Sequence, residues 1–266
     1  MTGTSPAVLL SRKKRRKKMF RRVLFIFLAV FILLVAAFVG VFRIEKFKIK
    51  NIIVSGNHVL ETGEIENQIK SVMAAKTFGI IPRDRIFSFS AAKAESALES
   101  RFGRLNFVEV KKRMPADIEV TVSEREPFVL LCLEGSKDCF FTDETGFIFE
   151  EAPFFSSGVF IKFFDRRFER PGLGRFLISR ESMERVFSFL DKVDSFFSPE
   201  DVYLNGGGVY EFQTADGFRL ILDESDDWNL SFSNLETFLS GYKVGEYPDF
   251  DYIDLRFGNK VFYKIK

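Results

Sequence analysis

The sequence predicts an α+β protein in which one apolar helix precedes a small β-α-α-β-β domain and a larger, mainly antiparallel β domain with flanking helices. Three patterns support this prediction: an uninterrupted apolar segment at 23–42, alternating strand and helix patterns after it, and a predominantly strand-like remainder. We therefore expect a basic tail at 1–22, a membrane helix at 23–42, a first domain at 43–127 and a second domain at 128–266.

The composition excludes several classes of function. The 266 residues include 39 Lys and Arg, 37 Asp and Glu, one His and two Cys. One histidine and two cysteines cannot form a Cys/His zinc site or an iron–sulfur cluster from this chain alone. Nine of the basic residues precede residue 23, so the rest of the chain is acidic, unlike a nucleic-acid-binding domain. His58 is expected to be an exposed turn residue because no nucleophile can be assigned to it. We expect no catalytic residue, metal or cofactor.

The segment from Val23 to Phe42 contains no charged or hydrogen-bonding side chain. As a helix, it would span about 30 Å, which is the thickness of the hydrocarbon core of a bilayer. The nine basic residues before it favour a cytoplasmic N-terminus, so both domains are expected outside the cytoplasm. A cleavable signal peptide ending near Val35-Ala36-Ala37 is the alternative, although the basic and apolar stretches are long for one.

The first domain carries the strongest local pattern. A strand at 47–54 is followed by two amphipathic helices, the second capped by Ser90. In the hairpin 107–123, a loop at Met114-Pro115-Ala116 places valines on one face and pairs Lys111 with Glu119 on the other. A slip of one residue would place lysine and arginine opposite the apolar residues, so the pattern selects this register.

The second domain is predicted from its turns and helix caps. Asp216-Gly217 is expected to join two strands of a hairpin. One helix is expected after Ser179, and another from Ser233, where Ser-x-x-Glu forms a capping box. We therefore expect an antiparallel sheet with helices on one side.

The two cysteines lie on either side of a predicted hairpin turn. A type II′ turn at Gly135-Ser136 places Cys132 opposite Cys139. Directly opposed residues have Cα atoms within disulfide range, and such bonds persist in oxidising compartments. We expect a disulfide between Cys132 and Cys139, and two buried thiols are the alternative.

Several motifs occur in an order that is typical of one family. The turn at Gly56-Asn57, the turn at Arg113-Met114-Pro115 and the ending Glu124-Arg125-Glu126-Pro127 resemble the POTRA domain of the FtsQ/DivIB bacterial cell-division proteins. Phe141-Thr142-Asp143-Glu144-Thr145-Gly146 resembles the turn that opens the family's second domain, and Tyr252–Phe257 resembles its C-terminal Tyr-x-Asp-Leu-Arg motif. The resemblance covers nearly the whole chain.

This resemblance implies a non-enzymatic scaffold in the bacterial inner membrane at the division septum. Similar proteins bind the membrane-anchored division protein FtsB, itself paired with FtsL, so FtsB-like and FtsL-like proteins and other divisome components are the expected partners. Two alternatives from other classes are a membrane-anchored enzyme acting on envelope material and a POTRA-type chaperone of secretion. The second domain shows no paired carboxylates on one predicted surface and too few long alternating strands for a membrane barrel.

The last two strands, Tyr252–Phe257 and Lys260–Ile265, are expected to turn at Gly258-Asn259. With a two-residue loop, Leu255 opposes Phe262 in the core, and the other apolar residues of the last strand, Val261, Tyr263 and Ile265, lie on the opposite face. A terminal strand that is apolar on both faces is an aggregation hazard unless something covers it. A partner strand added at this edge would remove the hazard.

The family resemblance implies the same binding region. Arg256 and Phe257 occupy motif positions that the family uses to bind FtsB, although Phe257 replaces the commoner Tyr and lacks its hydroxyl group. An edge that the chain's own helix covers is the alternative. The predicted partner-binding residues are Arg256, Phe257, Val261, Phe262 and Tyr263.

Overall fold

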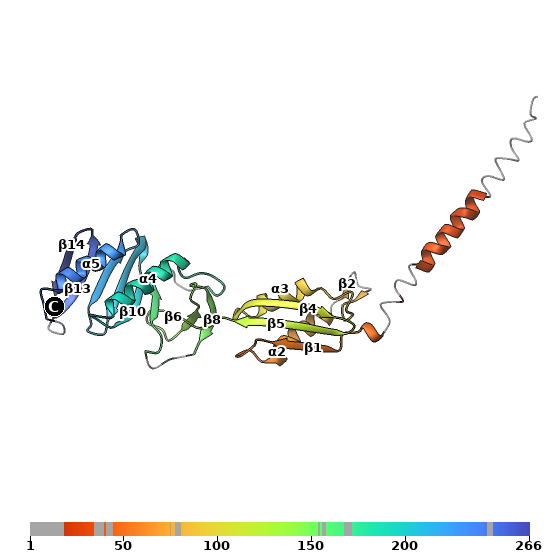
Figure 1. Ribbon diagram of the computed structural model, residues 1–266, viewed down its shortest axis with the longest axis horizontal. Helices are drawn as coiled ribbons and strands as arrows, with labels where there is room; N and C mark the ends of the chain where they lie inside the picture. Colours follow the sequence, from red (N-terminus) through yellow and green to blue (C-terminus); the bar gives the residue numbers. More distant parts are fainter. Residues whose placement is uncertain are drawn as a thin grey trace, which may run out of the picture. The chain divides into compact units, whose positions relative to one another are not determined.

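A computed structural model (Figure 1) describes residues 19–34, 40, 45–74, 76–77, 81–153, 155, 158–167, 172–243 and 247–266. The chain divides into two compact units, which we describe separately. The first comprises residues 1–98 and 107–122, and the second comprises residues 99–106 and 123–266.

The predicted membrane segment is described only in part. Residues 19–34 are helical, and their large apolar side chains are exposed. The basic tail before residue 19, the alternative cleavage site Val35-Ala36-Ala37 and the last residues of the segment, 41 and 42, lie outside the described residues. Within the described part of the chain, no helix has both the length and the apolar character needed to cross a membrane.

The first unit contains a three-stranded sheet in the order β1-β5-β4 and two helices. The elements in chain order are η1 (Glu45–Phe47), β1 (Asn51–Ser55), α2 (Thr62–Ala74), β2 (Lys76–Thr77), β3 (Ile81–Pro82), α3 (Ala91–Arg101), β4 (Leu105–Arg113) and β5 (Asp117–Glu124). Apart from η1 and the short β2–β3 pair, this is the predicted β-α-α-β-β order.

Amphipathic spacing explains this packing. The spacing i, i+4 places Ile65 and Ile69 of α2 on one buried stripe, and α3 buries Ala94 and Leu98 in the same way. The hydroxyl of Ser90 accepts a hydrogen bond from the backbone N–H of Lys93, so the predicted cap of α3 is confirmed.

Two details of the first unit differ from the prediction. The first strand begins at Asn51 rather than at residue 47, because residues 45–47 form a 3-10 turn. The charge pair between the last two strands joins Arg113 to Glu119 at 2.8 Å, whereas Lys111 bonds Glu109 on its own strand. The acidic partner of Lys111 is therefore not the one that the pattern predicted.

The second unit contains one nine-stranded sheet in the order β14-β13-β12-β11-β10-β9-β6-β7-β8. Its strands are β6 (Val129–Cys132), β7 (Cys139–Thr142), β8 (Ile148–Ala152), β9 (Lys162–Asp165), β10 (Pro199–Leu204), β11 (Val209–Thr214), β12 (Arg219–Asp223), β13 (Phe250–Phe257) and β14 (Lys260–Ile265). Most neighbours are antiparallel, as predicted, but β9 is parallel to both β6 and β10, and β12 is parallel to β13. The sheet is therefore mixed.

Helices α4 (Arg180–Val193) and α5 (Trp228–Leu239) cover one face of this sheet (Figure 1). The core between the two layers contains Met183 and Val186 from α4 and Leu235 from α5, packed with Phe212 and Ile253 of the sheet. Every second residue of β11 and β12 is buried, which is the period expected for a sheet covered on one face.

The start of α4 agrees with the sequence prediction, whereas the start of α5 does not. Ser179 caps α4 by accepting a hydrogen bond from the N–H of Ser182. Helix α5 begins at Trp228 and is capped by Asp227, so the predicted start at Ser233 is wrong. Aspartate caps a helix as well as serine does, and burial of the Trp228 side chain in the core favours the earlier start.

Candidate functional site

The site that the sequence predicts lies on β14, the last strand at one edge of the nine-stranded sheet. Its inner side pairs with β13 in the antiparallel direction. Among the residues that the structure describes, no strand pairs with its outer side. An edge strand of this kind presents unpaired backbone N–H and C=O groups to a possible partner.

The register of β13 and β14 differs from the prediction. Phe257 opposes Lys260 as expected, but Asp254 rather than Leu255 opposes Phe262. Between these two pairs, β13 contains one residue more than β14, so a β-bulge shifts the pairing by one residue. The predicted pairing of Leu255 with Phe262 is therefore wrong.

The shifted register exchanges the two faces of β14. The ring of Tyr263 lies 5.0 Å from that of Phe238 in α5 and 5.8 Å from that of Phe250, on the helix-covered face. Phe262 lies on the helix-free face, with its ring 4.8 Å from that of Phe257. The prediction that Phe262 faces the core while Tyr263 lies on the opposite face is therefore wrong.

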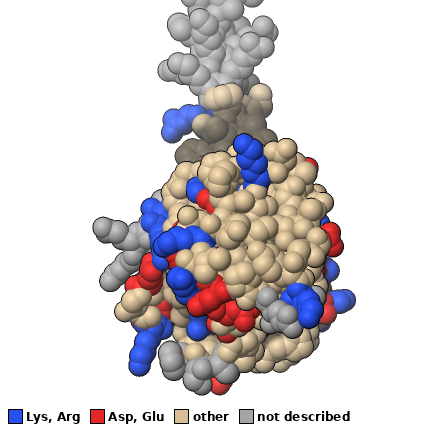
Figure 2. Space-filling view, turned by 90° about the vertical axis from the view of Figure 1, so that its left-hand side faces the viewer, with Lys and Arg blue, Asp and Glu red and all other residues tan. Residues whose placement is uncertain are grey.

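Each face of the edge carries apolar side chains that are partly open to solvent. The side chains of Phe257, Phe262, Tyr263 and Ile265 are about half exposed, with relative accessibilities of 51, 49, 47 and 50%. Val261 is half-buried against the core below α5. The end of the molecule where β13, β14 and α5 lie shows a broad surface without charged residues, with charged residues around its margins (Figure 2). The site thus combines an open backbone edge with apolar area.

Arg256 and Asp254 support the bulge. The Nε and Nη2 atoms of Arg256 donate to the two carboxylate oxygens of Asp254 at 2.9 and 2.6 Å, and the backbone N–H of Arg256 donates to the same carboxylate. The hydrogen bond with this buried carboxylate raises the pKa of the Arg256 guanidinium. Because the pair holds the bulge, Arg256 positions the edge rather than offering a free charge.

Helix α5 contributes a residue that sequence reasoning missed. The side-chain amide of Asn234 donates a 2.7 Å hydrogen bond to the carbonyl oxygen of Gly258 in the β13–β14 turn. Gly258 has a positive φ of 63°, a conformation that favours glycine. Asn234 lies far from the turn in sequence, and no local pattern links the two.

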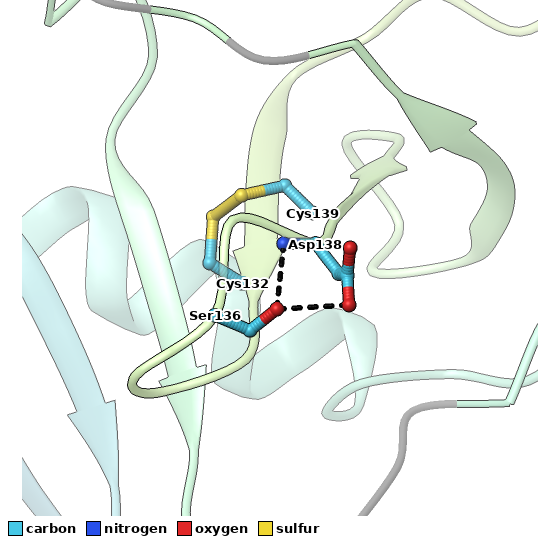
Figure 3. The surroundings of a disulfide bond; sticks show 4 residues. All are labelled: Cys132, Ser136, Asp138 and Cys139. Atoms are coloured by element: carbon cyan, nitrogen blue, oxygen red, sulfur yellow. Dashed lines mark hydrogen bonds between the residues drawn. A yellow bond between two sulfur atoms is a disulfide. The ribbon is translucent and has the colours of Figure 1, made fainter.

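The two cysteines lie elsewhere in the same sheet. Cys132 and Cys139 are directly opposed on β6 and β7, and the structure contains a disulfide between them (Figure 3). The hydrogen-bonded turn joins Leu133 to Ser136, so Gly135, with a φ of 77°, is the third residue of the turn. The predicted type II′ turn, which requires glycine second, is therefore wrong. Five strands separate this bond from β14, so it does not belong to the open edge.

Metal coordination has no candidate centre in the described part of the chain. No group of three or more His, Cys, Asp and Glu side chains is arranged there to hold a metal ion. His58 is exposed.

The fold and the site define a two-part α+β protein in which a small POTRA-like domain precedes a large sheet with an open terminal edge. Residues 47–125 match the family model described as POTRA domain, FtsQ-type. This match supports an FtsQ/DivIB family protein, the family that the sequence motifs resemble. No curated protein gives a significant match to the chain.

Proposed function

We propose that this protein is a non-enzymatic scaffold of the bacterial cell-division machinery and that it binds partner membrane proteins by strand addition at β14. The FtsQ-type POTRA domain suggests the scaffold role, and proteins of this family are typically non-enzymatic. The observation that supports the binding site is the open edge of β14 with half-exposed aromatic side chains on both of its faces.

Strand addition suits this edge for two physical reasons. An added strand would pair with backbone groups on the outer side of β14, which supplies affinity without any particular side chain. It would also cover Tyr263 on one face and Phe262 on the other, and burial of apolar area contributes roughly 25 cal/mol per Å². Pairing and burial together would remove an aggregation-prone edge.

The family resemblance names the proposed partners and place of action. The partners would be FtsB-like and FtsL-like membrane division proteins together with other divisome components. Residues 23–42 would anchor the chain in the cytoplasmic membrane at the division septum, with the N-terminus in the cytoplasm and both domains outside it. An oxidising compartment of this kind is compatible with the disulfide between Cys132 and Cys139.

Capture of partners by the full-length chain tests this proposal. Tyr263→Lys places a charge beside Phe238, and Phe262→Ser removes the ring that packs on Phe257. Each variant, expressed with an affinity tag and purified from membranes, should recover at least about tenfold less of the FtsB-like and FtsL-like proteins, because replacing a hot-spot residue at the centre of an interface costs about 2 kcal/mol or more. Partner recovery is measured by quantitative mass spectrometry.

Val159→Lys provides the matched control. Val159 is an apolar residue of the same unit, is 67% exposed and lies outside the β14 edge. This variant should recover the partners as the parent chain does. Undiminished recovery by both β14 variants would refute binding at this edge.

A further inference from the structure

An alternating series of acidic and basic side chains crosses the second unit along the order of the strands. Its members, from the β6–β7 turn to the edge strand, are Glu134, Arg166, Glu211, Arg219, Asp251 and Lys264. Glu211 and Arg219 alternate with buried core residues of β11 and β12, so they lie on the helix-free face of the sheet. Lys264 lies on the same face because it opposes Tyr252 and follows Tyr263, which faces the helices.

Successive members lie within ion-pair distance of one another, between 2.8 and 3.9 Å. Arg166 binds both carboxylate oxygens of Glu134 at 2.8 Å, and its Nη1 lies 3.8 Å from Oε2 of Glu211. The same Oε2 atom accepts a 3.2 Å hydrogen bond from Nη1 of Arg219. Each inner member of the series therefore lies between two charges of opposite sign.

The series ends at the edge strand with a base. Nη2 of Arg219 lies 3.9 Å from Oδ1 of Asp251, and Oδ2 of Asp251 lies 2.9 Å from Nζ of Lys264. The Lys264 side chain is 62% exposed, and β14 is the last strand of the sheet. If a further strand continued the alternation, the residue beside Lys264 would be an acid.

The other residues of β14 also determine which residue types a partner strand must carry opposite them. Lys260 lies on the same face as Lys264, four residues away, and it has no acidic partner among the described side chains. Phe262 separates the two lysines on that face. On the helix-covered face, the strand presents only apolar residues, namely Val261, Tyr263 and Ile265. Directly opposed side chains of neighbouring strands interact, so each of these positions selects a type of partner residue.

We infer that the strand that pairs with β14 carries a five-residue pattern of acid, apolar, apolar, apolar, acid, with its two carboxylates beside Lys260 and Lys264. The pattern reads the same in both directions, so it holds for a parallel or an antiparallel partner. This inference rests on the proposed strand addition, and it names the chemistry of the partner segment rather than a particular protein.

A strand fused to the full-length chain tests the inference at high effective concentration. The extension Asn-Gly-Thr-Val-Glu-Val-Phe-Val-Glu after Lys266 forms a two-residue turn and places its glutamates opposite Lys264 and Lys260. A matched extension carries lysine at both glutamate positions. Hydrogen exchange of the β14 amides, followed by mass spectrometry, should be about tenfold slower with the glutamate extension than with the lysine extension.

Charge reversal and salt separate the electrostatic contribution from backbone pairing. Lys260→Glu leaves the backbone hydrogen bonds of β14 unchanged. It should reduce severalfold the difference in hydrogen exchange of the β14 amides between the glutamate and the lysine extension. High salt should reduce the same difference in hydrogen exchange for extensions of the parent chain, because salt screens exposed charges. Equal protection by both extensions would refute the acid pattern while leaving strand addition in place. Protection by neither extension would overturn the proposed function together with this inference.

Discussion

The two edges of the nine-stranded sheet differ in the hydrogen bonding of the backbone groups on their outer sides. At β8, the N–H of Ile148 donates to the carbonyl of Arg175, and the carbonyl of Ile148 accepts from the N–H of Gly174, both at 2.8 Å. At β14, the structure records pairing only on the inner side within its described residues. At its first residue, β8 thus pairs with a segment of the chain itself, whereas no described segment pairs with the outer side of β14.

The side chains show the same contrast. Ile148 and Phe149 of β8 are each only 3% exposed, whereas Phe262 of β14 is 49% exposed. Gly103 approaches β8 so closely that a Cβ atom added there would lie 2.4 Å from the carbonyl oxygen of Phe149, and the neighbouring Arg104 binds Glu150. The comparison shows that this fold can cover an edge, so the open β14 edge is a specific feature of the chain rather than a general property of its sheet.

The largest effect on this contrast is expected from Gly103→Ala. The new methyl group would meet a backbone oxygen that cannot rotate away, so the closed edge should loosen and the free energy of unfolding should fall by about 3 kcal/mol. Urea denaturation of the full-length chain measures the loss, with fluorescence of the single tryptophan, the buried Trp228, as the reporter of the second unit. Gly158→Ala is the control, because nothing lies within 4 Å of its added Cβ. An equal effect of both substitutions would contradict the closed-edge explanation.

A smaller effect is expected from removal of the disulfide. Cys132 and Cys139 close a loop with a sequence separation of 7, so the combined Cys132→Ser and Cys139→Ser variant should lose about 2 kcal/mol in the same denaturation experiment. Partner capture at β14 should remain, since five strands lie between the two sites. Reduction should destabilise the parent chain and leave the variant unchanged. Equal stability of the reduced and oxidised parent chain would argue against a stabilising role for this bond.

The smallest effect concerns the turn that leads into β8. Burial opposes ionisation of Asp143, but hydrogen bonds from Thr145, Phe147 and Arg125 outweigh it and lower the pKa of the Asp143 carboxyl below its usual value of 3.8. A lowered folded-state pKa stabilises the protein above the unfolded pKa, and this contribution is lost as the pH falls through the folded-state value.

The pH dependence of the free energy of unfolding tests this contribution. Stability of the parent chain should decline below about pH 4, and Asp143→Asn should flatten that decline because asparagine does not titrate there. An unchanged slope in the variant would exclude Asp143 as a source of acid sensitivity.

Local patterns predicted much of the fold. The alternation of apolar and charged residues in β4 and β5 and the Ser179 cap of α4 depend on neighbours in sequence, and the structure agrees with these predictions. The start of α5 was predicted wrongly because two capping signals compete, and the burial of Trp228 decides between them. Asn234 was missed because its bond to Gly258 joins residues that are distant in sequence.

The sequence by itself determined the two-part α+β organisation, the strands of the last hairpin and the residues that form its edge, because side-chain periodicity and turn chemistry are local properties. Only the tertiary structure decided which face each edge residue occupies and which charges lie together. A bulge held by Asp254 and Arg256 shifts the register, and the series from Glu134 to Lys264 brings together residues from strands far apart in sequence. Such contacts depend on how strands align across the sheet, which no local pattern specifies.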